Sequence, residues 1–128
     1  MAFSNVPVGV YGNTEAAADL TGKLFYAAKI DANGKIAVAA ADAGGAIDGV
    51  ITLDSPADRA ARITFVGIEK VALGGTVTFA QDLAIDAAGK FVAATTGDVA
   101  VGRCMLGGAA GGIGTMWIYP KAQFTVPA

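Results

Sequence analysis

The side chains able to do acid–base or metal chemistry in this sequence are mainly carboxylates. The 128 residues include eleven Asp and Glu residues but no histidine, which is the commonest general base and metal ligand near neutral pH. A calcium loop needs a dense run such as D-x-D-x-D-G, and the sequence has none. A zinc site would depend on carboxylates, because there is only one cysteine. We therefore expect no metal site and no cofactor.

The candidate nucleophiles also lack a catalytic setting. Neither of the two serines, Ser4 and Ser55, lies in a G-x-S-x-G elbow. No glycine–lysine pair is followed by the Ser or Thr of a phosphate-binding P-loop. Cys104 has no partner for an internal disulfide and lies in an apolar run, which predicts a small buried side chain. We therefore predict that the protein is not an enzyme.

Composition excludes further classes of function. Nine Lys and Arg residues against eleven acids give a net charge of -2, which is too little basic material for a nucleic-acid-binding face. No apolar run approaches the roughly 20 residues of a membrane span, and the N-terminus lacks the basic and apolar regions of a signal peptide. We expect a soluble product of the cytoplasm that binds neither nucleic acid nor membrane.

Two aspartate-containing turns reveal an internal repeat. The segment Ile30–Lys35 reads Ile-Asp-Ala-Asn-Gly-Lys, and Ile85–Lys90 reads Ile-Asp-Ala-Ala-Gly-Lys. Asp supplies an acceptor for a turn and Gly allows positive φ, so both segments predict β-hairpin turns rather than ligand sites. Matching the flanking residues gives one copy over about 20–70 and a second over about 73–121.

The repeat predicts the fold class. Short β-branched and aromatic runs separated by turns indicate an all-β protein, and signals for helices are scarce. Two β motifs of this size would pack together as a small barrel or sandwich, and for Trp117, inside a predicted strand, core packing is the expected role rather than ligand binding. The expected organisation is an extended N-terminal arm (1–19), one β domain (20–121) and a C-terminal tail (122–128).

The N-terminal arm is the candidate contact region. It carries no charge before Glu15 and has regularly spaced apolar side chains, unlike a disordered tail. One interpretation is an edge strand added to the protein's own sheet. The other is an arm that docks on a neighbouring subunit or on the surface of a larger assembly by strand addition or pocket filling. The candidate contact residues are Phe3, Val6, Val8, Val10 and Tyr11.

The repeated pattern resembles a known group of viral proteins. The pattern is carried by the two turn segments, by a glycine followed by an apolar strand, and by an Ala/Gly-rich loop (30–35, 85–90, 49–53 and 102–112). It resembles the small Ala/Gly/Val-rich decoration proteins of bacteriophage capsids, which are encoded near the major capsid protein.

This resemblance implies a function without chemistry. It implies a virion protein that binds the major capsid protein on the outer capsid surface, as a homotrimer, and stabilises the head. Alternatives are another head or tail component, such as a head fibre base or tube protein, and a glycan-binding β module. An enzyme stays as a further alternative if the acids converge on an open pocket.

Overall fold

Short β-strands joined by turns and irregular segments make up the described part of the protein. The computed structural model describes residues 10–40, 43–119 and 123–127, and within them it contains no α-helix. This confirms the predicted all-β class. The strands are β1 (Val10–Glu15), β2 (Ala27–Ile30), β3 (Ile36–Val38), β4 (Gly49–Leu53), β5 (Ala60–Thr64), β6 (Gly67–Ala72), β7 (Asp82–Ile85), β8 (Phe91–Ala93), β9 (Val99–Ala100), β10 (Gly102–Leu106), β11 (Ile113–Ile118) and β12 (Phe124–Thr125).

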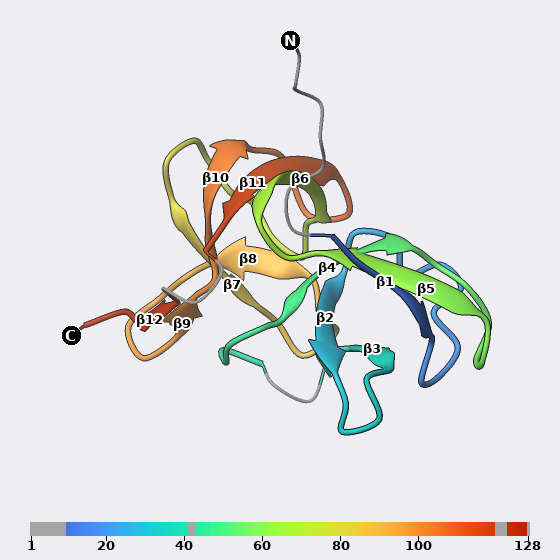
Figure 1. The fold of residues 1–128 in the computed structure, drawn as a ribbon. Helices are drawn as coiled ribbons and strands as arrows, with labels where there is room; N and C mark the ends of the chain where they lie inside the picture. Colours follow the sequence, from blue (N-terminus) through green and yellow to red (C-terminus); the bar gives the residue numbers. More distant parts are fainter. Residues whose placement is uncertain (1–9, 41–42, 120–122, 128) are drawn as a thin grey trace, which may run out of the picture.

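Two five-stranded antiparallel sheets share one topology. The first has the order β1-β5-β4-β2-β3 and the second the order β6-β11-β10-β7-β8. In Figure 1 the first sheet, coloured blue to green, lies mainly to the right, and the second, green to red, lies above and to the left. Each strand of the first sheet therefore has an equivalent at the same position in the second.

The aspartate turns occupy equivalent places in the two sheets. The Asp31 carboxylate accepts hydrogen bonds from the backbone N–H groups of Asn33 and Lys35, both at 2.9 Å. The Asp86 carboxylate does the same for Ala88 and Lys90, at 2.9 and 3.0 Å. The glycines of the two turns have φ of 77° and 84°, which glycine adopts at low cost. Both aspartates are thus turn formers, as their spacing predicts.

The sheet boundaries differ from the repeat boundaries inferred by sequence matching. The apolar run 63–68 is split, because β5 ends at Thr64 and β6 starts at Gly67, whose φ of 111° interrupts an extended strand. Strand β6 belongs to the second sheet, and β1, within the expected arm, belongs to the first. The first sheet therefore takes in residues 10–64 and the second 67–118, and β12 pairs with β9 in a separate small sheet.

Each five-stranded sheet is rolled so that its edges meet. A parallel bridge joins Ala16 to Ile36 in the first sheet, and an equivalent bridge joins Leu73 to Phe91 in the second. A single bridge is not a ladder, so neither sheet closes as a complete hydrogen-bonded barrel.

The core is unequal in its two halves. The smaller cluster belongs to the first sheet, and its largest members are Leu20, Ile36, Ile51 and Ile63. The larger cluster surrounds Phe91 and includes buried residues of both sheets. Cys104 lies in this larger cluster at 1% exposure, which confirms the expected buried thiol. Burial raises the pKa of that thiol.

The expected core position of Trp117 is wrong. Strand residues alternate between faces, and Met116 and Ile118 on either side of Trp117 are fully buried. The indole therefore points away from the core and is 49% exposed.

Candidate interaction surfaces

The outer face of the second sheet carries a row of cross-strand neighbours that includes Trp117. In order across the sheet the row is Ile68 of β6, Trp117 of β11, Arg103 of β10 and Asp82 of β7. We call these four residues the second outer row. Ile68 is 61% exposed and Trp117 49% exposed, so large apolar groups of this row face solvent.

Further aromatic side chains extend the second outer row. The Tyr119 ring lies 6.5 Å from the Trp117 ring in an edge-on arrangement and 6.0 Å from the Phe124 ring. The Arg103 guanidinium lies 5.4 Å from the centre of the Phe79 ring, which is 64% exposed. Exposed aromatic groups packed beside an arginine are typical of the centres of protein interfaces.

A hydrogen bond fixes the polar end of this surface. The Tyr119 hydroxyl donates to the Asp82 carboxylate at 3.1 Å. Burial and the contact with Asp82 raise the pKa of Tyr119, against a smaller opposing effect of the Arg103 charge. The phenol therefore stays protonated at neutral pH and keeps Asp82 in place beside Arg103.

The equivalent row of the first sheet is mostly covered. It consists of Val10, Thr64, Val50 and Ala27, in the same strand order. We call these four residues the first outer row. Val50 and Ala27 are fully buried, in the core cluster shared with the second sheet, and Thr64 is 9% exposed. The same face is thus buried within the chain in one half and open in the other.

The second half covers the first outer row with two elements. One is β6, whose Glu69 carboxylate accepts a hydrogen bond from the Thr64 hydroxyl at 3.1 Å, and whose Ala72 N–H donates to the Phe25 carbonyl at 3.0 Å. The other is the β7–β8 turn, where the Gly89 carbonyl accepts from the Ala27 N–H at 2.8 Å.

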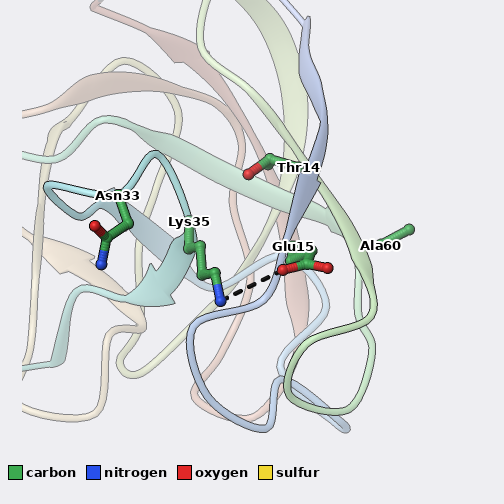
Figure 2. A pocket seen from close by; sticks show the side chains of 5 residues that line it. All are labelled: Thr14, Glu15, Asn33, Lys35 and Ala60. Atoms are coloured by element: carbon green, nitrogen blue, oxygen red, sulfur yellow. Dashed lines mark ion pairs between the residues drawn. The ribbon is translucent and has the colours of Figure 1, made fainter.

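The equivalent elements of the first half, β1 and the β2–β3 turn, border an open hollow of about 510 Å³ (Figure 2). Its lining residues are Thr14, Glu15, Asn33, Lys35 and Ala60. The Lys35 ammonium forms ion pairs with Glu15 at 3.3 Å and with Asp58 at 3.2 Å. Hydrogen bonds to Asp58 and Glu15 raise the pKa of Lys35, so the ammonium stays charged.

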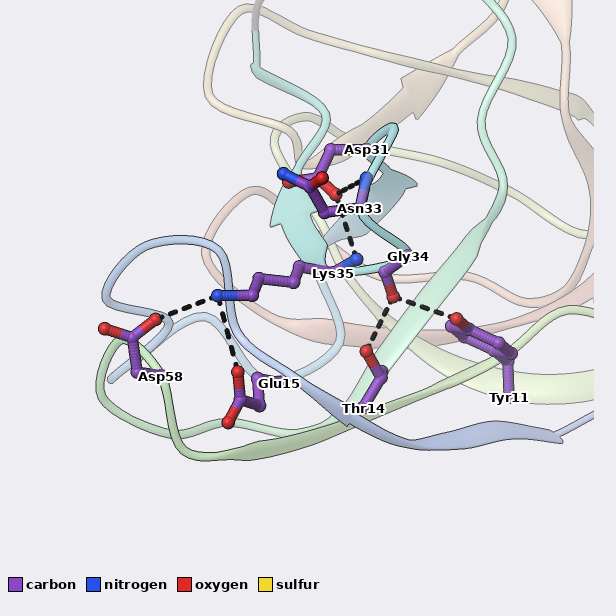
Figure 3. Close-up of polar contacts among 8 residues, drawn as sticks. All are labelled: Tyr11, Thr14, Glu15, Asp31, Asn33, Gly34, Lys35 and Asp58. Atoms are coloured by element: carbon purple, nitrogen blue, oxygen red, sulfur yellow. Dashed lines mark hydrogen bonds and ion pairs between the residues drawn. The ribbon is translucent and has the colours of Figure 1, made fainter.

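The turn carbonyl of Gly34 ties β1 to this hollow. It accepts hydrogen bonds from the Tyr11 hydroxyl at 2.9 Å and the Thr14 hydroxyl at 2.6 Å (Figure 3). A side chain at position 34 would place its Cβ 3.1 Å from the Tyr11 hydroxyl, so glycine keeps this contact open. The hollow is thus a polar surface in which the Lys35 ammonium lies between the Glu15 carboxylate of the lining and the Asp58 carboxylate beside it.

Within residues 10–40, 43–119 and 123–127, no group of three or more His, Cys, Asp and Glu side chains is placed to hold a metal ion. In the same residues, no helix is long and apolar enough to cross a membrane.

The contact residues inferred from the sequence fall in different places. Val10 begins β1 and is 37% exposed, whereas Tyr11 is half-buried against the β2–β3 turn. Both therefore belong to an edge strand of the protein's own sheet, the first of the two interpretations. Phe3, Val6 and Val8 lie outside the described residues. A role of these five side chains in binding a capsid stays a prediction.

Sequence reasoning missed the second outer row. The signal was present in the run Met116-Trp117-Ile118, where alternation places the central residue opposite its neighbours. Two apolar neighbours on the core face leave the tryptophan on the outer face, although its type suggests burial.

Comparisons with known proteins agree with the fold. Comparison with models of protein families and with curated proteins finds no match. Among solved structures, the chain is similar to the crystal structure of the head fiber gp8.5 N base of bacteriophage phi29. The TM-score is 0.63 at 13% sequence identity, over 93% of this chain and 98% of that chain. The two chains share a fold.

Proposed function

We propose that this protein is a structural component of a bacteriophage head, with no enzymatic activity. The observation that carries the proposal is the shared fold with a phage head fiber base, which extends over nearly the whole of both chains. A fold alone does not determine function. The exposed apolar surface around Trp117 adds independent support, because large exposed apolar patches mark sites of protein association.

Its place in the virion would be the outer surface of the capsid. There it binds the major capsid protein as a homotrimer and stabilises the shell. Several modest contacts made at once produce a durable attachment, so an oligomer suits this task better than a single copy.

The N-terminal segment is the proposed capsid contact. The first residues of β1, away from the bridge that joins Ala16 to Ile36, lie at the edge of the first sheet, and sheet edges can accept a further strand from a partner. The contact residues would be Phe3, Val6, Val8, Val10 and Tyr11, with the last two held by β1.

Electron microscopy of purified particles tests the proposal. Particles made with and without this protein are compared, and difference density is expected on the outside of the capsid at symmetry-related positions. Particles that show no such density, although the folded protein was present during assembly, would refute the proposal.

A head fibre base is a second candidate, favoured by the matched structure itself. Fibres projecting from the sites of the extra density would distinguish a fibre base from a decoration protein.

A glycan-binding module is a third candidate, favoured by the exposed Trp117 with Tyr119, Asp82 and Arg103 beside it. An amphipathic aromatic ring next to polar groups suits contact with sugars. Binding of the isolated protein to a glycan array, lost in Trp117→Ala, would favour this candidate.

A further inference from the structure

We propose that copies of this chain join head to tail, with the second outer row of one copy covered by the β1 and β2–β3 turn surface of the next. The inference deepens the proposed function, because it names the surfaces that would build the oligomer. The biological use of the oligomer rests on the proposed function. The contact itself is inferred from the geometry of the two halves.

The packing between the halves of one chain provides the template. Because the two sheets have the same strand order, the first and second outer rows are equivalent faces. The first outer row is covered by β6 and the β7–β8 turn, through the contacts of Glu69, Ala72 and Gly89. Among residues 10–40, 43–119 and 123–127, no third half of this kind covers the second outer row.

The equivalents of the covering elements are present in the first half and are accessible. Strand β6 corresponds to β1, and the β7–β8 turn corresponds to the β2–β3 turn. By the bridges and pairings, Ala72 corresponds to Glu15, and Gly89 corresponds to Gly34. The Gly34 carbonyl already accepts hydrogen bonds from Tyr11 and Thr14, so the β2–β3 turn would contact the next copy without the hydrogen bond that Gly89 makes to Ala27. Glu15 lines the hollow at 52% side-chain exposure. Repeating the internal packing between two copies therefore brings this hollow against the second outer row.

The charges of the two surfaces are complementary. The outer face of the second sheet carries Arg103 and the exposed Lys70 against one carboxylate, Asp82, which leaves one excess positive charge. In the hollow, Lys35 is paired with Glu15 of the lining and with Asp58 beside it, and these three side chains leave one excess negative charge. Complementary potentials favour the correct orientation of two surfaces.

The contact is heterologous, because one copy contributes its second outer row and the other contributes its β1 and β2–β3 turn surface. A heterologous contact closes into a ring when its rotation allows, and otherwise continues as a filament. A face-to-face dimer through Trp117 would use the same patch twice and would leave the hollow unused. The two arrangements therefore respond differently to changes in the hollow.

Two variants separate these arrangements. The row variant is Ile68→Thr with Trp117→Thr, which gives position 117 the residue found at the equivalent Thr64 and keeps the β-branched character of a strand. The hollow variant is Glu15→Arg with Ala60→Tyr, which reverses the local charge and fills the space. A matched control is Leu53→Thr, which removes a 38% exposed apolar group of β4 outside both surfaces.

Sedimentation velocity of the full chain over a range of concentrations up to on the order of 1 mM gives the readout. We expect the original chain and Leu53→Thr to associate alike, and each of the other variants to associate at least about tenfold more weakly. An equimolar mixture of the row and hollow variants should form a dimer, because it offers one intact row and one intact hollow. Circular dichroism and thermal melting check that each variant is folded.

Three results would overturn the inference: a monomer throughout the concentration range, a hollow variant that associates like the original chain, or a mixture of folded variants that stays monomeric. A row variant that no longer self-associates but still binds particles would show that attachment does not need the head-to-tail contact. That result would leave the proposed function intact. Self-association without any particle binding would leave the contact intact and refute the proposed function.

Discussion

The substitution Gly102→Ala tests the close packing of the second sheet. Gly102 begins β10 opposite Ile118 of β11. A Cβ at this position would lie 2.7 Å from the Trp117 carbonyl oxygen and would also collide with the Met116 side chain. The methionine can change its rotamer, but the carbonyl belongs to the backbone of the sheet and moves only with the strand.

The expected cost follows from two opposing effects. Overpacking of a well-packed site costs about 1–3 kcal/mol. Replacing glycine by alanine also restricts the unfolded chain, which offsets roughly 0.4–1 kcal/mol of that cost. We expect the free energy of unfolding to fall by about 1–2 kcal/mol, and Tm by roughly 3–10 °C for a chain of this size.

Urea denaturation followed by circular dichroism measures this change, and Gly75→Ala is the matched control. Its Cβ would lie 3.5 Å from a Val92 methyl group, which is an ordinary contact, so its stability should match or slightly exceed the original. Gly49, the equivalent of Gly102 in the first sheet, should behave like Gly102, because a Cβ there would lie 2.6 Å from the Thr64 carbonyl oxygen. Equal stability of Gly102→Ala and Gly75→Ala would refute the reasoning.

Three further predictions concern the arm, the tryptophan and the thiol. Deletion of residues 1–9, which spares β1, should weaken binding to capsids in a co-sedimentation assay while the thermal melt is unchanged; full binding would contradict the docking role. Trp117→Ala should lower the free energy of unfolding by about 1–2 kcal/mol, and a loss near the 3–5 kcal/mol of a core tryptophan would contradict its exposed position. The thiol of Cys104, buried and with a raised pKa, should react with an aromatic disulfide reagent at the rate of unfolding, and rapid reaction of the folded protein would show an accessible thiol.

The local signals in the sequence predicted the turns well. The carboxylates of Asp31 and Asp86 bond to nearby backbone N–H groups, and this chemistry involves residues at most four positions apart. Such short-range patterns are readable without knowledge of the rest of the chain. The all-β class follows from the same kind of information.

The boundaries between the sheets were harder to predict, because they depend on long-range pairing. Residues 63–68 read as one strand by alternation, yet Thr64 pairs with β4 and β1 whereas Ile68 pairs with β11. Nothing in the local pattern separates these partners except Gly67, whose positive φ is visible only in the structure. Likewise, the apolar residues of β1 suggested an arm as readily as an edge strand.

The difference between the two outer rows explains why residue type alone misplaced the interaction surface. In this duplicated chain, β6 and the β7–β8 turn of the second half cover the outer row of the first half. The equivalent outer row of the second half is left open. In the first row the two fully buried members are Ala27 and Val50, which are small enough to lie under the second half. At the equivalent positions the second row has Asp82 and Arg103, which would be costly to bury within a single chain without partners. Larger and more polar side chains thus appear where the described part of the chain offers no cover. Trp117 beside them has the size and the exposure of an anchor for a partner rather than of a core residue.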